Sequence, residues 1–323
     1  MRPAKTRSCQ RALPPNDPKV AESLFYFGAN QIWLQHVDIA EQYYEQAIAI
    51  ERKLPFEQAD QLPYMLLDLF TLPSYRANPA RAEAIVTEAH DLFVRRFGPE
   101  HITVAFSLQR MGNVRVERGD YAGARPLLTS ALGILDKRSA SPIDIASIQE
   151  TLADALAAEG DAAGAAALRR QVLSAFASAY GPNHVVTASA KNQLAWSLIT
   201  SKQYAEAARL SDEVIAVYRL TDNPWDTQLE TALLNKAWSL EATGRPGGQP
   251  LVDEAIRIID HLDQSQRCDK GRSREGIVSW YELAHRHAEA ARQFAIEFSD
   301  LSAACGHDST AYQRALKLAP NYR

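Results

Sequence analysis

The chain has 323 residues, 46% of them hydrophobic, and its 35 basic and 39 acidic side chains give a formal net charge of −4. This length allows a substantial core, and the lack of a basic excess argues against a nucleic-acid partner. Three cysteines, Cys9, Cys268 and Cys305, are too few for a disulfide framework and favour the reducing cytoplasm. No run of residues is long and apolar enough for a membrane span.

The first elements follow a basic stretch that contains several prolines. Residues 1–16 show no helical periodicity, so we expect a flexible tail. The pattern changes at residue 17, because Asp17 suits an N-cap and Pro18 suits the first helical turn. A helix rich in large apolar side chains is expected to follow as far as Leu34, and a second helix is expected over 38–54.

Small residues recur along residues 17–262 at a nearly constant spacing. In the expected second helices, steps of 42, 42, 41 and 42 residues separate Ala40, Ala82, Ala124, Ala165 and Ala207. In the expected first helices, steps of 42, 42, 41, 42 and 42 separate Gly28, Phe70, Gly112, Ala153, Ala195 and Ala237. Small side chains let two antiparallel helices pack closely. Because a single hairpin leaves an apolar face open, the hairpins must stack on one another.

Residues 97–135 are the clearest copy of this unit. They predict a helix around Gly112, a polar turn at Gly119 and a second helix around Ala124. The segment at the start of this copy, Phe97-Gly98-Pro99-Glu100-His101, returns 83 residues later as Tyr180-Gly181-Pro182-Asn183-His184. We therefore expect the two histidines to share a structural role in the turns between repeats.

Other parts of the chain depart from the regular unit. Phe70 replaces the small residue of the second copy and residues 72–74 interrupt its turn, so this hairpin is expected to be splayed or kinked. The glycine-rich stretch 244–250 is expected to lengthen the turn of the sixth hairpin. Residues 263–275 are polar and basic and predict a loop. Residues 276–323 predict a C-terminal hairpin whose first helix is long, over about 277–304, and whose last helix is repeat-like.

These residues resemble the tetratricopeptide-repeat family, in the long-period form of kinesin light chains and nephrocystin-like proteins. The resemblance extends over about residues 18–262 and rests on the two histidine-containing segments and on Leu108, Met111, Gly112, Gly119, Tyr121, Ala124, Leu128 and Ala131. It implies an all-α fold, a right-handed superhelical solenoid of about seven antiparallel helical hairpins.

The sequence offers little catalytic chemistry. The stretch 244–250 is not followed by Gly-Lys-Ser/Thr, and no Gly-x-Ser-x-Gly or His-Glu-x-x-His is present. A metal site would have to combine Cys268, His285, Cys305 and His307, whose spacing matches no known zinc signature. We expect no enzyme, no cofactor and no metal.

The resemblance also implies a concave groove lined by the first helices. The matching positions hold Phe25, Trp33, Gln109, Asn113, Glu150, Asp154, Asn192, Trp196 and Trp238. Asparagine can bond the backbone of an extended peptide, and tryptophan offers an apolar wall with one donor. Two alternatives stay open: Trp196 and Trp238 pack between neighbouring hairpins, and Glu150 and Asp154 form a solvated face. The basic side chains with which some family members clamp a terminal carboxylate are lacking at these positions.

We therefore expect a non-enzymatic scaffold that binds a peptide segment or partner protein in the groove. One alternative is an assembly or regulatory subunit that uses the convex face or an end of the solenoid, including self-association into a homo-oligomer. Its candidate surfaces are the first helix and the basic stretch 267–274. A further alternative is a metal or catalytic protein that uses the C-terminal cysteines and histidines. The expected location is the cytoplasm. The alternative is a bacterial envelope lipoprotein, if a signal upstream of Cys9 is missing.

Overall fold

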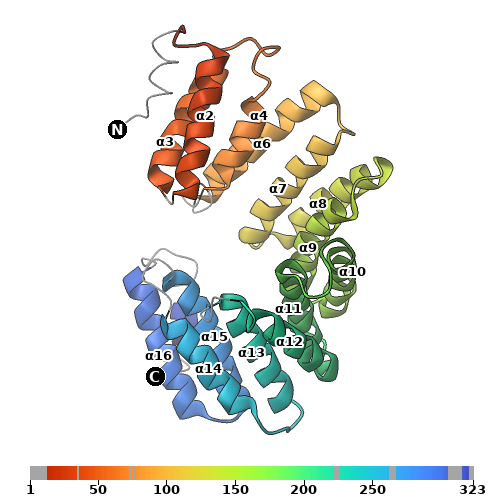
Figure 1. Cartoon of the computed structure of the whole chain (residues 1–323), viewed down its shortest axis with the longest axis vertical. Coiled ribbons are helices and arrows are strands. Elements are labelled where there is room, and N and C mark those ends of the chain that lie inside the picture. Colours follow the sequence, from red (N-terminus) through yellow and green to blue (C-terminus); the bar gives the residue numbers. More distant parts are fainter. Residues whose placement is uncertain are drawn as a thin grey trace. The chain divides into compact units, whose positions relative to one another are not determined.

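The computed structural model describes residues 13–34, 36–72, 75, 78–221, 226–261, 267–304 and 315–319. Over these residues the fold is all-α, without strands (Figure 1). The chain forms two compact units, Met1–Glu159 and Gly160–Arg323. The boundary between them lies inside the range 17–262 that the repeat spacing assigned to one array. Most of the expected N-terminal tail, residues 1–12, lies outside the described part.

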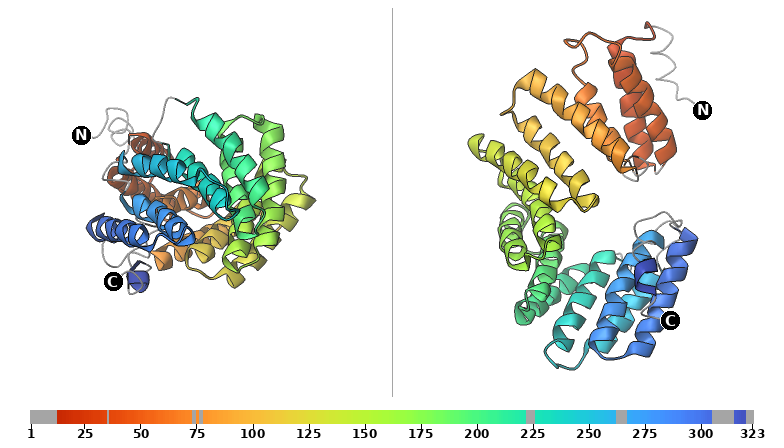
Figure 2. Two further views of the ribbon diagram at one scale, coloured as in Figure 1. Left: turned by 90° about the horizontal axis from the view of Figure 1, so that it is seen from below. Right: turned by 180° about the vertical axis from the view of Figure 1, so that it is seen from behind.

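Each unit is a stack of helices in which sequence neighbours pack together (Figure 2). In the first unit, α2 packs on α3, α4 on α6, and α7 on α8. In the second unit, α11 packs on α12, α13 on α14, and α15 on α16. The helices of the first unit are α2 (Pro18–Trp33), α3 (Val37–Glu51), α4 (Leu62–Phe70), α6 (Pro79–Phe97), α7 (Ile102–Glu117), α8 (Tyr121–Lys137) and α9 (Pro142–Ala158). The helices of the second unit are α10 (Ala162–Tyr180), α11 (Val185–Thr200), α12 (Tyr204–Tyr218), α13 (Thr227–Glu241), α14 (Gly248–His261), α15 (Arg267–Leu283) and α16 (His287–Ala304). The stacking of helical hairpins expected from the repeat spacing is confirmed within each unit.

Glycines allow the close packing of two helix pairs in the first unit. A Cβ atom added at Gly28 would lie 2.7 Å from the ring of Tyr44 in α3, and one added at Gly112 would lie 2.7 Å from Leu128 in α8. Both distances are too short for real side-chain contacts. The expectation that small residues stand where helices touch is confirmed, and Ala40, which is fully buried, shows the same constraint from the second helix.

The turns that precede α7 and α11 are built in the same way. Gly98 and Gly181 end the preceding helices with φ angles of 81° and 91°, a left-handed region that glycine tolerates. His101 and His184 are then the N-caps, and their Nδ1 atoms accept from the backbone N–H groups two residues later, at 3.3 and 3.2 Å. Each ring also stacks on the aromatic ring four residues earlier, with ring centroids 4.6 Å apart for Phe97–His101 and 5.2 Å apart for Tyr180–His184. The shared structural role expected for these histidines is confirmed.

The second hairpin differs from the regular ones through a short first helix. Helix α4 has nine residues and ends at Phe70, which is buried in the core of the first unit. The hairpin was expected to be splayed or kinked around residues 72–74, but residues 73 and 74 lie outside the described part. Within that part, the helix is shortened, and the large side chain of Phe70 fills core space at its end.

The C-terminal region differs from the expectation in two ways. The predicted loop at 263–275 is helical from Arg267 onward, because α15 begins there. One polar side chain of this stretch is buried: Arg274 donates hydrogen bonds to Asp260 of α14 and to Gln293 of α16. The predicted long helix over 277–304 is instead two helices, α15 and α16, packed as a hairpin. The break lies at His285, whose φ of 56° is left-handed, and neither glycine nor proline marks it in the sequence.

Candidate functional site

The first helices of successive hairpins form one layer within each unit. In the second unit, α11 contacts α13 and α13 contacts α15, whereas the second helices α12 and α14 make few or no contacts with each other in the described part of the chain. In the first unit, α7 contacts α9 in the same way. Helices on the inside of a curved stack approach each other more closely than those on the outside. We therefore take α7 and α9 in the first unit, and α11, α13 and α15 in the second, as the inner layer, and seven of the nine expected groove residues lie on these helices.

In the first unit, the amide side chains of this layer tie neighbouring first helices together. The Nε2 atom of Gln109 in α7 donates to the carbonyl and to the Oγ of Ser147 in α9, both at 2.9 Å. One helical turn later, Thr151 Oγ1 in α9 donates to Asn113 Oδ1 in α7, also at 2.9 Å. These amides therefore hold two hairpins in register.

The second unit repeats this arrangement between α11 and α13. The Nδ2 atom of Asn192 donates to the backbone carbonyl of Gln228 at 2.8 Å and to its side-chain oxygen at 3.1 Å. Asn235 of α13 donates back to the carbonyl of Asn192 at 3.4 Å. Asn192 is buried, and its Oδ1 has no hydrogen-bond partner there. The sequence placed these amides on the right helices, but it gave no sign that they bond the next helix.

Trp196 and Trp238 lie next to each other on the inner layer of the second unit. Their rings meet edge to face, with centroids 6.5 Å apart. Trp238 is half-buried and packs against the cores on both sides of α13, with its Nε1 3.5 Å from the carbonyl oxygen of Gly276. Trp196 is 45% exposed, although most of α11 is buried. Trp238 thus packs between neighbouring hairpins, whereas Trp196 leaves an aromatic surface open to solvent.

The remaining expected residues lie on α2 and α9 of the first unit. Phe25 is half-buried and stacks on Tyr44 of α3, with ring centroids 4.8 Å apart, so it contributes to hairpin packing. Trp33 ends α2 and is 88% exposed. On α9, Glu150 is half-buried and Asp154 is exposed, and both interact with other groups.

A buried carboxylate that the sequence did not reveal lies at the end of α3. Glu51 is buried, and its Oε2 atom has no hydrogen-bond partner in the described part of the chain. Burial, together with the nearby charge of Asp60, raises the pKa of Glu51 to about 7, although the backbone at the start of α4 and the charge of Arg96 act in the opposite direction. This buried carboxylate lies close to the start of α4, the first helix of the second hairpin.

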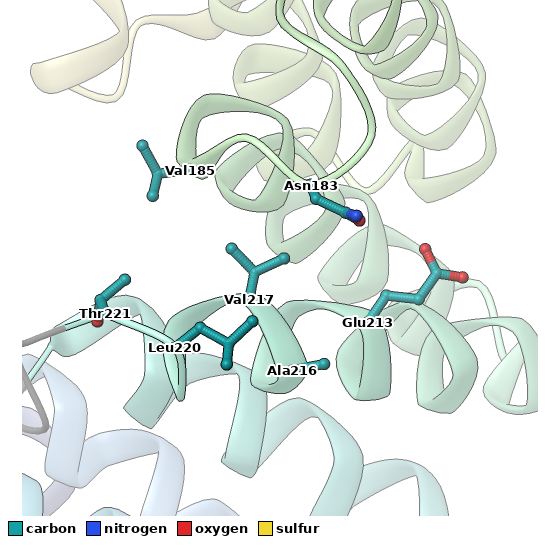
Figure 3. Close-up of a pocket in the computed structure, with 7 residues that line it drawn as sticks. All are labelled: Asn183, Val185, Glu213, Ala216, Val217, Leu220 and Thr221. Carbon is teal, nitrogen blue, oxygen red and sulfur yellow. The ribbon is translucent and has the colours of Figure 1, made fainter.

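The second unit also contains an open pocket of about 400 Å³ beside α12. Figure 3 shows Val185 facing Val217 and Leu220 across the opening, with Asn183 and Glu213 at its other end. Leu220, at the C-terminal end of α12, is 88% exposed. The sequence did not reveal this pocket, because the pocket depends on positions that hold different residues in two repeats. Such differences are visible only when the repeats are aligned position by position.

The described residues include no cluster of three or more histidine, cysteine or acidic side chains arranged for a metal ion. The side chain of Cys268 and residues Cys305 and His307, which a metal site would have needed, lie outside the described part. No described helix has the length and apolarity needed to cross a membrane.

Comparisons with known proteins point to one fold. The family model of the tetratricopeptide repeat matches residues 144–219. Among curated proteins, a clustered mitochondria protein homolog of Aspergillus clavatus is 26% identical over 238 residues, which is 70% of this chain and 19% of that protein. The chain thus spans about a fifth of the length of the curated relatives it matches.

Two solved structures illustrate the likeness. A putative kinesin light chain of Podosopora anserina with repeats of this type has 22% identity and a TM-score of 0.53, covering 61% of this chain and 95% of that one. The apo form of the quorum sensor NprR from B. thuringiensis has 11% identity and a TM-score of 0.64, covering 98% and 91%. At these identities the likeness shows the fold, and the expected tetratricopeptide-repeat fold is confirmed.

Proposed function

We propose that this chain, a tetratricopeptide-repeat protein by fold, is a non-enzymatic scaffold that holds a peptide segment of a protein partner on the inner layer of its first helices. The observation that carries the proposal is Trp196. Large aromatic side chains left in water on an otherwise buried helix are typical of interaction hot spots. Trp196 is such a residue, and Trp238 supports its ring from the next first helix.

Polar side chains adjoin Trp196 on the same face of α11. Gln193 and Thr200 are exposed, about one turn before and one turn after it. An apolar wall between hydrogen-bonding groups suits an extended peptide, because its backbone needs polar partners while its side chains need pockets. We place the binding energy on Trp196 and these neighbours.

The amides of Gln109, Asn113 and Asn192 have a different place in this proposal. They already bond the next first helix, so a peptide would have to share their hydrogen bonds. Replacing them would also remove contacts between hairpins, which confuses loss of binding with loss of stability. Trp196 is the cleaner residue to test.

The test selects short random peptides on the wild-type protein and measures their affinity for Trp196→Ala and Trp33→Ala. Truncating a hot-spot aromatic costs about 2 kcal/mol, or roughly thirtyfold in affinity. We expect this loss with Trp196→Ala and no loss with Trp33→Ala, which removes an exposed tryptophan of the other unit. Peptides that bind Trp196→Ala as tightly as wild type would contradict the proposal.

A second candidate function is assembly through the first hairpin. Its α2–α3 end exposes large apolar side chains, namely Tyr26, Ile32, Trp33, Leu34 and Ile39. Such a patch is typical of protein interfaces, and it matches the alternative of self-association through an end of the array. Light scattering over a range of protein concentrations tests it. Association that Trp33→Ala abolishes and Trp196→Ala retains would favour this function over the first.

A further inference from the structure

The open pocket beside α12 can be compared with the same place in another repeat. Residues of the α7–α8 hairpin and the α11–α12 hairpin correspond at a constant offset of 83, as His101 does to His184. Three pocket positions, Asn183, Leu220 and Thr221, therefore correspond to Glu100, Lys137 and Arg138, and each differs in charge or polarity.

In the α7–α8 hairpin the corresponding place is bridged by polar contacts. Lys137 Nζ lies 2.5 Å from Glu100 Oε1, forming an ion pair between α8 and the turn before α7. Arg138 Nε donates to the backbone carbonyl of Glu100 at 2.8 Å. Both long side chains thus cross from the second helix to the turn.

In the α11–α12 hairpin neither contact can form. The side chains of Leu220 and Thr221 are too short to reach the turn, and neither carries a charge. The hydroxyl of Thr221 instead donates to the carbonyl of Tyr218 at 2.7 Å. The pocket that results has Val185, Ala216, Val217 and Leu220 as its apolar surface. The exposed leucine is therefore explained as one wall of an open pocket.

The charged groups at the rim are already neutralised. Glu213 pairs with Lys191 at 2.8 Å and with Arg209 one turn earlier. Lys191 in turn donates to the carbonyl of Pro182 at 2.9 Å, which fixes the turn that forms the upper wall. With its ions paired, the rim favours an uncharged apolar group over an ion.

We propose that this pocket binds an aliphatic side chain of a peptide segment from a protein partner, with the amide of Asn183 available to the peptide backbone. The number of lining residues argues for a peptide over a second copy of the chain. Seven residues line the pocket, whereas a stable interface between folded proteins uses about 20–30 on each side. The volume lies at the lower end of the range of about 300–1,000 Å³ for ligand pockets, which leaves room for an anchoring side chain together with part of the adjoining peptide. This site is separate from the inner layer around Trp196.

The test uses a variant in which the pocket residues are replaced by the residues that make the polar contacts in the α7–α8 hairpin. In the sealed variant, Asn183→Glu, Leu220→Lys and Thr221→Arg are combined. Short random peptides are selected on wild-type protein, counter-selected on the sealed variant and titrated against both. We expect surviving peptides to share an aliphatic position and to bind the sealed variant about tenfold to a hundredfold more weakly, because one buried side chain is lost. They should keep their affinity for Trp196→Ala, which separates this site from the proposed inner surface.

A reverse exchange provides the matched control. Glu100→Asn, Lys137→Leu and Arg138→Thr should open a pocket in the α7–α8 hairpin and add a second site for the same peptides. Both triple variants change exposed side chains, apart from the half-buried Thr221, and we expect melting temperatures within about 2 °C of wild type.

Two results would overturn the proposal. One is a selection in which no peptide survives counter-selection or in which the survivors share no aliphatic position. The other is a wild-type dimer in light scattering that the sealed variant fails to form, since the occupant would then be a second copy.

Discussion

The α7–α8 hairpin of the first unit and the α11–α12 hairpin of the second are built alike but present different surfaces. Each starts from a left-handed glycine and a histidine N-cap, and each inner helix bonds the next one through an asparagine. The hairpins differ where their second helices end, at an ion pair in one and an open pocket in the other. Positions shared by the repeats thus hold the fold, while positions that differ give the two hairpins different surfaces.

The buried contacts of the two hairpins also differ in a compensating way. Gly112 of α7 lies against Leu128 of α8, whereas the corresponding residues of the other hairpin are Ala195 and Ser211, both fully buried. A larger residue on the first helix thus accompanies a smaller one on the second. This exchange keeps the space between the helices filled in both hairpins.

Gly112→Leu should have the largest effect on stability, because it tests this packing directly. The added side chain would collide with Leu128, and overpacking of this kind costs about 3 kcal/mol. Urea unfolding followed by circular dichroism measures the loss. Gly133→Ala in α8 is the matched control: nothing lies within 4 Å of its added Cβ, and removal of a helical glycine should stabilise by about 0.5–1 kcal/mol. Equal effects of the two changes would contradict the close contact between Gly112 and Leu128.

A smaller effect, of roughly 2–3 kcal/mol, is expected from the titration of Glu51. Because Glu51 lies in the first unit, its titration should make the stability of that unit depend on pH. Its pKa is about 7 in the folded protein against an ordinary value of 4.5, so the folded state binds this proton more tightly. The contribution to stability is therefore fully present below about pH 4.5 and is lost as the pH rises through 7.

Glu51→Gln should remove that pH dependence, because a glutamine side chain of nearly the same size does not titrate. Unfolding free energies of wild type and variant, measured from pH 5 to pH 8, should diverge toward high pH, with the variant more stable. A constant difference across this range would show that Glu51 does not titrate there.

The smallest effect, about 1 kcal/mol for each site, is expected when a shared histidine cap is removed. His101→Ala and His184→Ala each delete an acceptor for a backbone N–H at a helix start, together with a stacked ring. His101→Asn and His184→Asn should lose less, because asparagine is also a good N-cap. Similar losses at the two positions would support the equivalence of the hairpins, and a loss at only one would limit it.

Much of the fold could be predicted because the repeat signal is local and is copied many times. The spacing of Gly28, Gly112 and Ala40 located the helix contacts, and the two histidine segments located their turns. The break at His285 could not be predicted, because a left-handed residue without glycine or proline leaves no mark in the sequence. The helical start of α15 was missed because Arg274 is held by partners from α14 and α16.

The candidate site was predicted only in part. The repeat spacing placed Trp196 and Trp238 on first helices, and the family resemblance implied that these helices are inner; the structure shows that Trp196 is exposed while Trp238 is half-buried between cores. The spacing could not show that Asn113 and Asn192 bond the next helix, since their partners are far away in the chain. Nor could it show that Glu51 lies buried at the start of α4.

The sequence by itself determined the repeat, because close helix packing demands small residues at fixed intervals and those residues are visible in the chain. Only the tertiary structure decided which side chains remain open to a partner. Leu220 and Lys137 occupy the same repeat position, yet one lines a pocket and the other forms an ion pair across the seam. Their roles depend on what stands opposite in the turn, a contact made in space between residues 37 positions apart along the chain.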